Sequence, residues 1–365
     1  MQVKTSPDYV IVVVTTLLLA IGIVMVYSAS AVLAYDKYGD MLYFVKRQLL
    51  FASMGVFAMF YVSKVNPSKF YKLAIPFVVF CFLLLLAVLI PHVGILRNGA
   101  RSWIGVGSFS IQPSEFMKLA MIIFLSFVFN LPNFNITDFK RGFLPPLVFL
   151  LVIFGLIMLQ PDLGTGTVFI GTGIILIFVA GARVKHLAYF ATVLLIGFVI
   201  LVLAAPYRLQ RITAFLDPWK DPLGAGYHLI QSLYAIGPGG LFGLGFGMSR
   251  QKHLYLPEPH TDFIFSILAE ELGFIGSAFV LLLFFILVLR GIRIAMSAPN
   301  NFYSFVATGI TSMIMLQTLI NIGVVSGILP VTGITLPFLS YGGSSLILTL
   351  VGVGILLNIS RLCKR

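Results

Sequence analysis

The chain has few charged residues. Only 10% of its 365 residues are Asp, Glu, Lys or Arg, whereas ordinary soluble domains carry roughly 25%. Hydrophobic residues make up 59%, and apolar runs of about 20 residues, long enough to cross a hydrocarbon core, recur along the whole chain. This composition excludes a soluble core with a single anchor and predicts one integral membrane domain over residues 1–365.

Cysteine and histidine are also scarce. Cys81 falls inside a predicted span and Cys363 at the tail, so this topology keeps the two cysteines apart. The five histidines form no ligand pair at helical spacing, and neither a Ser-His-Asp order nor a nucleophile elbow is present. No cofactor is evident. A divalent cation, Mg²⁺ or Mn²⁺, held by Asp262, Glu258 and a substrate diphosphate stays open, because hard cations prefer oxygen ligands.

The apolar runs predict an all-α, polytopic bundle. Backbone groups in hydrocarbon have no water to bond, so the spans must be helices. We place ten of them at residues 9–34, 48–63, 71–90, 116–131, 144–160, 163–181, 186–205, 263–289, 303–328 and 337–360. The first is interpreted as an uncleaved signal anchor, because its apolar run is long enough to span.

Basic residues predict the orientation. Lysine and arginine recur at both termini and in every alternate loop, which places both termini in the cytoplasm by the positive-inside rule. The +12 net charge is therefore mostly a topology signal, and a nucleic-acid partner has no support. The predicted location is the cytoplasmic membrane, with membrane lipid around the spans and the Asp262 face outside.

One outer loop, about residues 206–261, is too long to be only a linker. Its glycine-rich stretch, Gly237 to Gly247, lacks the strand–helix setting of a nucleotide-binding fingerprint. A tight loop that exposes its backbone is the better interpretation. Residues Tyr227 to Ala235 are apolar enough to form a short helix on the outer interface.

Asp262 is the leading catalytic candidate, because it lies where this polar loop enters a span. A carboxylate at that depth usually faces a water-filled cavity or a partner rather than lipid. Capping of the following helix is the alternative, and the two roles are compatible. Other polar residues predicted on the same face could complete one substrate and diphosphate site: Arg47, Arg101, Trp103, Glu115, Lys118, Asp162, Glu258, Ser340 and Ser344.

Each of these residues also has a structural interpretation. Lys118 could snorkel toward the interface or pair with Glu115 at i−3. Arg47 could be an interfacial anchor, Asp162 a turn or cap residue, and Trp103 an interface aromatic or a platform for a sugar ring. Glu270 and Glu271 are adjacent on a helix, so at most one of them can face the Asp262 cavity.

Motifs spread over nearly the whole chain resemble the SEDS family (shape, elongation, division and sporulation), most closely its FtsW and SpoVE branch. The resemblance is carried by five motifs in family order: Arg101–Ile104, Gln112–Lys118, Gln160–Thr165, Leu256–Glu258 with Thr261–Phe265, and Pro337–Ser345. The span count and the long loop between the seventh and eighth spans also look like this family.

The resemblance implies a peptidoglycan glycosyltransferase that polymerises lipid II outside the membrane during cell division or sporulation. It also implies a partner, a class B penicillin-binding protein, within the division or sporulation complex. In the family, the aspartate matching Asp262 is the catalytic residue and the tryptophan matching Trp103 is needed.

Joined to the residues, the resemblance predicts a mechanism. Asp262 would act as general base on an acceptor sugar hydroxyl, and the leaving undecaprenyl diphosphate, carrying the glycan strand before transfer, would need cations. Arg47, Lys118 and Arg101 are the candidates, followed by Arg208 or Arg211. Two rival functions stay open: a lipid II flippase or transporter, and a non-catalytic scaffold for cell-wall synthases.

Overall fold

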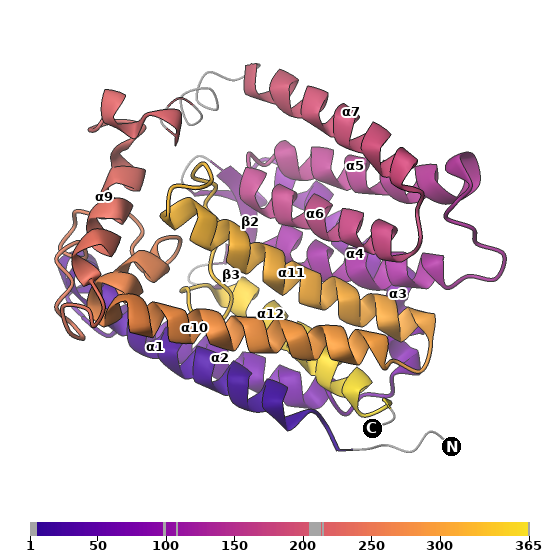
Figure 1. The fold of residues 1–365 in the computed structure, drawn as a ribbon, viewed down its shortest axis with the longest axis horizontal. Helices are drawn as coiled ribbons and strands as arrows, with labels where there is room; N and C mark the ends of the chain where they lie inside the picture. The colour runs from indigo at the N-terminus through magenta and orange to yellow at the C-terminus, as the bar shows by residue number, and fades with distance from the viewer. Residues whose placement is uncertain (1–5, 98–99, 107–108, 204–212, 214, 364–365) are drawn as a thin grey trace.

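Ten long helices occupy the ranges predicted for the spans (Figure 1). The computed structural model describes residues 6–97, 100–106, 109–203, 213 and 215–363. The ten helices are α1 (Tyr9–Tyr38), α2 (Tyr43–Val62), α3 (Ser68–Leu89), α4 (Pro113–Phe129), α5 (Leu144–Met158), α6 (Leu163–Val179), α7 (Val184–Leu203), α10 (Ile264–Met296), α11 (Asn301–Val325) and α12 (Gly343–Ser360). A π-helical turn, η1 (Phe139–Phe143), leads into α5.

The predicted fold class, a polytopic helical membrane protein, is confirmed. Among the described residues, seven helices are long and apolar enough to cross a membrane: α1, α2, α3, η1 joined to α5, α10, α11 and α12. The α6 helix and the Val184–Gly197 part of α7 are apolar but shorter, and α4 has 17 residues. The count of ten crossings therefore stays a prediction, as does the single domain.

Local sequence explains how the helices begin and end. Asp8 caps α1 by accepting hydrogen bonds from Val10 N and Ile11 N, and Gly39 ends that helix in the left-handed conformation with φ 69°. Asn300 caps α11 in the same way as Asp8, and Pro113 opens α4 at a position where no backbone donor is needed. Short-range signals therefore fix the starts of α1, α4 and α11.

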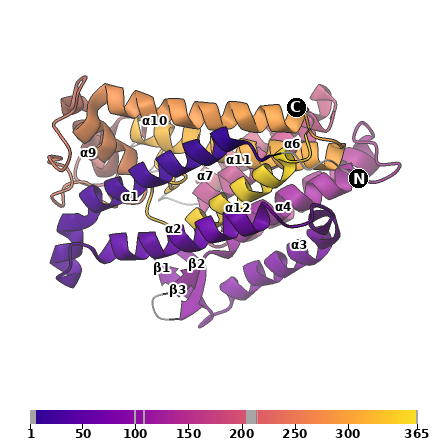
Figure 2. The ribbon, with the colours of Figure 1, turned by 90° about the horizontal axis from the view of Figure 1, so that it is seen from below.

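Helices α11 and α12 are largely buried, as is α4. They pack against each other, and α12 lies along α2 while α11 lies along α10 and α6 (Figures 1 and 2). Asp8 N donates to Ser360 Oγ over 3.1 Å, so the start of α1 meets the end of α12. We call this the terminal end of the bundle. The last turns of α10 also lie there, because Arg290 of α10 pairs with Asp8 over 2.7 Å. Asp262 precedes the first turn of α10, so we call that side of the bundle the Asp262 end.

A small antiparallel sheet precedes α4, and the sequence patterns did not predict it. Its strands are β1 (Gly94–Arg97), β2 (Ala100–Val106) and β3 (Phe109–Ile111), in that order (Figure 2). Trp103 pairs with Ile95, and Ile104 pairs with Gly94 and Ile111. Such short strands give too few alternating positions for a period-two pattern to stand out.

The long loop carries short helices: η2 (Pro218–Lys220), α9 (Tyr227–Ile236) and η3 (Gly237–Gly239). The predicted helix at Tyr227 to Ala235 is therefore confirmed as α9, although the side of the membrane it lies on stays a prediction. Leu229, Ile230 and Ala235 of α9 are buried, and the helix packs against α10 and α11.

The glycine-rich stretch crosses a break in α10. At Gly273 the backbone leaves helical geometry, with φ 64° and ψ −162°. Leu244 N and Gly245 N donate to the Glu270 and Glu271 carbonyls, while Phe274 N and Ile275 N donate to the Gly240 and Leu241 carbonyls. These bonds satisfy backbone groups that the break would otherwise leave unpaired.

Only glycine fits where the two backbones meet. A Cβ on Gly243 would collide with the Glu271 carbonyl, and a Cβ on Gly273 would collide with Gly243 N. The stretch is a tight loop, as predicted, but several of its backbone groups are paired with α10 rather than exposed. The predicted span 263–289 becomes α10, which continues to Met296.

Candidate functional site

Asp262 lies one residue before the N-cap of α10. The N-cap residue is Phe263, whose side chain makes no capping bond. The Asp262 side chain is half-buried, and a Cβ added to Gly333 would lie 3.6 Å from its Oδ2 atom. The segment that follows α11 therefore forms one wall beside the carboxylate. The carboxylate is neither fully exposed nor sealed.

Ser340 and Ser344 were predicted to bind substrate. The structure buries both, and it places Ser340 against the Asp262 segment. Ser340 Oγ donates to the Thr261 carbonyl over 2.6 Å and accepts from Leu336 N over 2.8 Å. Its hydroxyl is therefore engaged by backbone. Ser344 is in the first turn of α12, and its Oγ has no hydrogen-bond partner among the described residues.

Glu115 and Lys118 form a buried ion pair within the first turns of α4. Lys118 Nζ is 2.8 Å from Glu115 Oε1, and the two side chains are 3% and 8% exposed respectively. Lys118 Nζ also donates to Gln317 Oε1 of α11 over 3.4 Å. The predicted pairing at i−3 is present. The snorkelling alternative is wrong, because the ammonium group is directed into the bundle.

Asp162 caps α6, as one of its two interpretations predicted. Its Oδ1 accepts from Thr165 N over 3.0 Å, and its Oδ2 accepts from Gln112 Nε2 over 2.7 Å. Burial raises the pKa of the Asp162 carboxyl above its ordinary value. The residue joins the start of α6 to the residue before α4, which brings the Gln112–Lys118 and Gln160–Thr165 motifs together.

Two predicted basic residues are half-buried rather than sealed. The Arg47 guanidinium lies 4.3 Å from the centroid of the Tyr43 ring, one turn earlier in α2. Arg101 is in β2, and its side-chain stem crosses Gly94 of β1, where a Cβ would collide with it. Trp103 is two residues along β2, but a bulge shifts the pairing from Leu96–Arg101 to Ile95–Trp103, so the two side chains do not follow the regular alternation of a strand. Arg208 and Arg211 lie outside the described residues.

Glu258 is exposed and lies four residues before Asp262. It adopts φ 49°, and its Oε2 accepts from Thr261 Oγ1 over 3.0 Å. In the part of the chain that the structure describes, no three His, Cys, Asp or Glu side chains could together hold a metal ion. A divalent cation shared by Asp262, Glu258 and a diphosphate remains a prediction in which the diphosphate supplies further ligands.

Glu270 and Glu271 both turn toward the long loop. Lys252 Nζ lies 3.1 Å from Glu271 Oε1, which also accepts from Ser28 Oγ of α1 over 2.6 Å. Ser249 Oγ donates to Glu270 Oε2 over 2.6 Å. The two carboxylates therefore tie the loop to α10 and α1. Sequence reasoning missed Ser28, Ser249 and Lys252, because no local pattern links them.

His260 was also missed. Its ring packs between Phe44 and Tyr341, with ring centroids 4.3 and 5.6 Å away. Burial lowers the pKa of His260 to about 4, so the imidazole is neutral near pH 7. A neutral, packed ring two residues before Asp262 stiffens the segment that carries the carboxylate.

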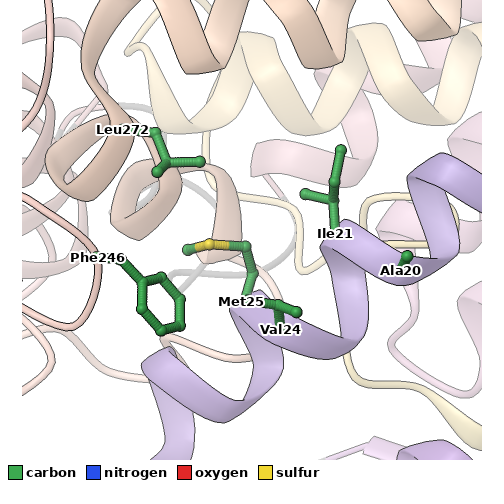
Figure 3. A pocket seen from close by; sticks show the side chains of 6 residues that line it. All are labelled: Ala20, Ile21, Val24, Met25, Phe246 and Leu272. Atoms are coloured by element: carbon green, nitrogen blue, oxygen red, sulfur yellow. The ribbon is translucent and has the colours of Figure 1, made fainter.

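An apolar cavity of about 420 Å³ lies beside the break in α10 (Figure 3). It is lined by Ala20, Ile21, Val24 and Met25 of α1, by Phe246 of the loop, and by Leu272. Its lining suits hydrocarbon rather than sugar or phosphate.

A family model described as "Cell cycle protein", covering FtsW, RodA and SpoVE, matches residues 8–365. The chain belongs to the FtsW/RodA/SpoVE family. It is 62% identical over 358 residues to stage V sporulation protein E of Bacillus subtilis (strain 168), and the match covers 98% of both chains. It is 42% identical to the "Probable peptidoglycan glycosyltransferase FtsW" of Geobacter sp. (strain M18), covering 97% of this chain and 96% of that one.

Solved structures of the family share the fold. A chain described under "Structural coordination of polymerization and crosslinking by a peptidoglycan synthase complex" matches with a TM-score of 0.79 and 33% identity, covering 97% of this chain and 98% of that chain. The rod shape determining protein RodA of Thermus thermophilus matches with a TM-score of 0.72 and 30% identity, covering 97% of each chain. The predicted family is confirmed.

Proposed function

We propose that this FtsW/RodA/SpoVE family protein is a peptidoglycan glycosyltransferase that polymerises lipid II, with Asp262 as general base. The observation that carries the proposal is the half-buried Asp262 carboxylate, placed at the end of the bundle where the polar motifs converge. A carboxylate in that setting can accept a proton from a sugar hydroxyl and still exchange with water.

The proposed reaction uses the carboxylate as a base. Asp262 takes the proton from the 4-hydroxyl of the acceptor lipid II sugar, and that oxygen attacks the anomeric carbon of the lipid-linked strand. The bond from this carbon to the diphosphate oxygen breaks, and undecaprenyl diphosphate leaves with the electron pair. A single displacement inverts the anomeric centre.

The leaving diphosphate needs positive charge. Arg47 and Arg101 are half-buried and closer to solvent, which suits contact with a phosphate. Lys118 is held by Glu115 and Gln317, so its proposed part is to fix the start of α4 rather than to meet the diphosphate first. The Figure 3 cavity suits an isoprenoid or acyl chain, because its lining residues are all apolar.

Orientation and partner belong to the same proposal. The basic residues of alternate loops place both termini in the cytoplasm and Asp262 on the outer face, where lipid II is polymerised. The solved relative described as a polymerising and crosslinking complex supports a crosslinking partner, for which we propose a class B penicillin-binding protein.

The test is lipid II polymerisation by the purified protein with its partner. We expect Asp262→Asn to lower the rate on the order of 100-fold or more, because it removes the base while keeping the shape. Asp221→Asn is the matched control: Asp221 is an exposed aspartate of the same loop, bonded locally to Gly224 N and Ala225 N. Unchanged polymerisation by Asp262→Asn would refute the proposed role. Lipid II transfer across liposomes without polymerisation would instead favour a flippase.

A further inference from the structure

Three consecutive backbone carbonyls, those of His260, Thr261 and Asp262, are each held by the C-terminal part of the chain. The His260 carbonyl accepts from Tyr341 N over 2.8 Å. The Thr261 carbonyl accepts from Ser340 Oγ over 2.6 Å, and the Asp262 carbonyl accepts from Asn321 Nδ2 over 2.8 Å. We call these three bonds the carbonyl clamp.

The clamp fixes the residue that bears the carboxylate. The peptide planes on either side of the Asp262 Cα atom carry the Thr261 and Asp262 carbonyls. Ser340 holds the first plane and Asn321 the second, so together they restrict both φ and ψ of Asp262. The direction of the Cα–Cβ bond, and with it the position of the carboxylate, depends on these two side chains.

The donors of the clamp are themselves immobile. Asn321 is 1% exposed, and its Nδ2 also donates to the Ile334 carbonyl over 2.7 Å. Ser340 Oγ accepts from Leu336 N, and the Ser340 carbonyl accepts from Gln48 Nε2 of α2 over 3.2 Å. The clamp is therefore anchored to α11, to α2 and to the segment between α11 and α12.

The clamp lies outside the hydrogen-bond ladder of α10. Ser266 N and Ile267 N donate to the Phe263 carbonyl, so the helix begins its own bonding one residue after Asp262. A helix does not orient the residues that precede its cap, so the clamp adds to the bonds that Thr261 N and Phe263 N donate to the Glu258 carbonyl.

We propose that Asn321 and Ser340 are positioning residues for the Asp262 base. This inference rests on the proposed function. A general base must lie within hydrogen-bond reach of the proton that it removes, and a misplacement of about 1 Å can cost roughly 100-fold in rate. The clamp supplies that precision through Asn321 Nδ2 and Ser340 Oγ, both of which are bonded to backbone groups.

The test compares two buried asparagines that make the same kind of contact. Asn358 of α12 is 3% exposed, and its Nδ2 donates to the Val62 and Val65 carbonyls over 2.8 and 2.7 Å. It lies at the terminal end, where α2 ends. Asn321→Ala should lower kcat of lipid II polymerisation on the order of 100-fold with little change in KM, because binding groups are kept. Asn358→Ala should keep kcat close to that of the unsubstituted protein.

The expected result is a kcat loss specific to Asn321, with thermal unfolding in detergent shifted equally by both substitutions. Equal kcat for Asn321→Ala and Asn358→Ala would overturn the proposal. A rise in KM with kcat unchanged would also overturn the proposal, because a positioning residue acts on the chemical step.

A second pair covers the case in which Asn321→Ala does not fold. Ser340 and Ser360 are both buried serines whose Oγ accepts a backbone N–H and donates to a carbonyl; for Ser360 these are Asp8 N and the Leu357 carbonyl. Ser340→Ala should lower kcat, and Ser360→Ala should not. If both leave kcat unchanged, the clamp does not position the base.

The two proposals fail in different ways. If Asp262→Asn keeps normal activity, the general-base assignment is wrong, whatever the clamp variants do. If Asp262→Asn is inactive while the Asn321 and Ser340 variants keep normal kcat, only the clamp inference is wrong.

Discussion

Two buried lysine–glutamate pairs lie in the described part of the bundle, and they are built in opposite ways. Lys118 and Glu115 are three residues apart on α4, 2.8 Å from nitrogen to oxygen. Lys252 and Glu271 join the long loop to α10 over 3.1 Å, and Ser28 of α1 donates to the same Glu271 oxygen. One pair is local to a single helix, whereas the other connects three separate parts of the chain.

The two pairs are similarly buried but differ in how far apart their members lie in the sequence. Both pairs are almost fully removed from solvent, so each carries a large desolvation cost that its partner must offset. Beyond its own ion pair, the α4 pair makes one further side-chain hydrogen bond among the described residues, from Lys118 Nζ to Gln317 Oε1. Glu271 also accepts from Ser249 N over 3.3 Å, so the loop pair belongs to a network that joins the long loop to α10 next to its break.

The largest expected effect comes from breaking the loop pair alone. Lys252→Met leaves the Glu271 carboxylate, 0% exposed, without its cation and should lower the free energy of unfolding on the order of 3–5 kcal/mol. Denaturant unfolding in detergent measures it. Lys220→Met is the control, because the exposed Lys220–Asp217 pair at 3.4 Å should contribute about 1 kcal/mol or less. Equal losses for the two variants would contradict the network.

Replacing both members of each pair sharpens the comparison. Lys118→Met alone leaves the buried Glu115 carboxylate without its cation and should lower the free energy of unfolding by about 3 kcal/mol. Adding Glu115→Leu should recover most of this loss, because apolar side chains can replace an isolated buried pair. Adding Glu271→Leu to Lys252→Met should not recover it, since Ser28 and Ser249 then lose their acceptor. Equal recovery in both double variants would show that the two pairs are equivalent.

His260 is a buried, neutral residue of the same loop, and it should make the stability of the protein depend on pH. Burial lowers the pKa of His260 to about 4, below its ordinary 6.5. Between these values the unfolded state binds more protons, so stability should fall as pH drops from about 6.5 to about 4, by up to about 3 kcal/mol. Thermal unfolding against pH measures this, and His260→Gln should flatten the curve. A curve unchanged by His260→Gln would assign the pH dependence elsewhere.

The smallest expected effect tests the third member of the loop network. Ser28→Ala removes two hydrogen bonds to charged groups, the one that Ser28 Oγ donates to Glu271 Oε1 and the one that it accepts from Lys252 Nζ, and should lower the free energy of unfolding by about 2 kcal/mol. Ser126→Ala is the control, because Ser126 Oγ bonds only the Ile122 carbonyl of its own helix. A loss no greater than that of the control would place Ser28 outside the network.

Sequence patterns were strongest where the physics is short-range. Apolar runs located every long helix to within several residues, and the spacing of Glu115 and Lys118 predicted their ion pair. Asp162 as a helix cap followed from its place in a turn. The β-sheet around Trp103 and the role of Ser340 could not be predicted, because both depend on segments that meet only in the fold.

The sequence by itself determined a membrane bundle, its family, and an acidic residue at the mouth of a span. Hydrocarbon allows only helices, and the motifs are specific in type and order. Only the tertiary structure decided how Asp262 is held. Its carbonyl bonds Asn321, 59 residues away, and the preceding carbonyl bonds Ser340, 79 residues from Thr261. No local pattern encodes such contacts, since packing of α11 and α12 brings the donors to the carboxylate.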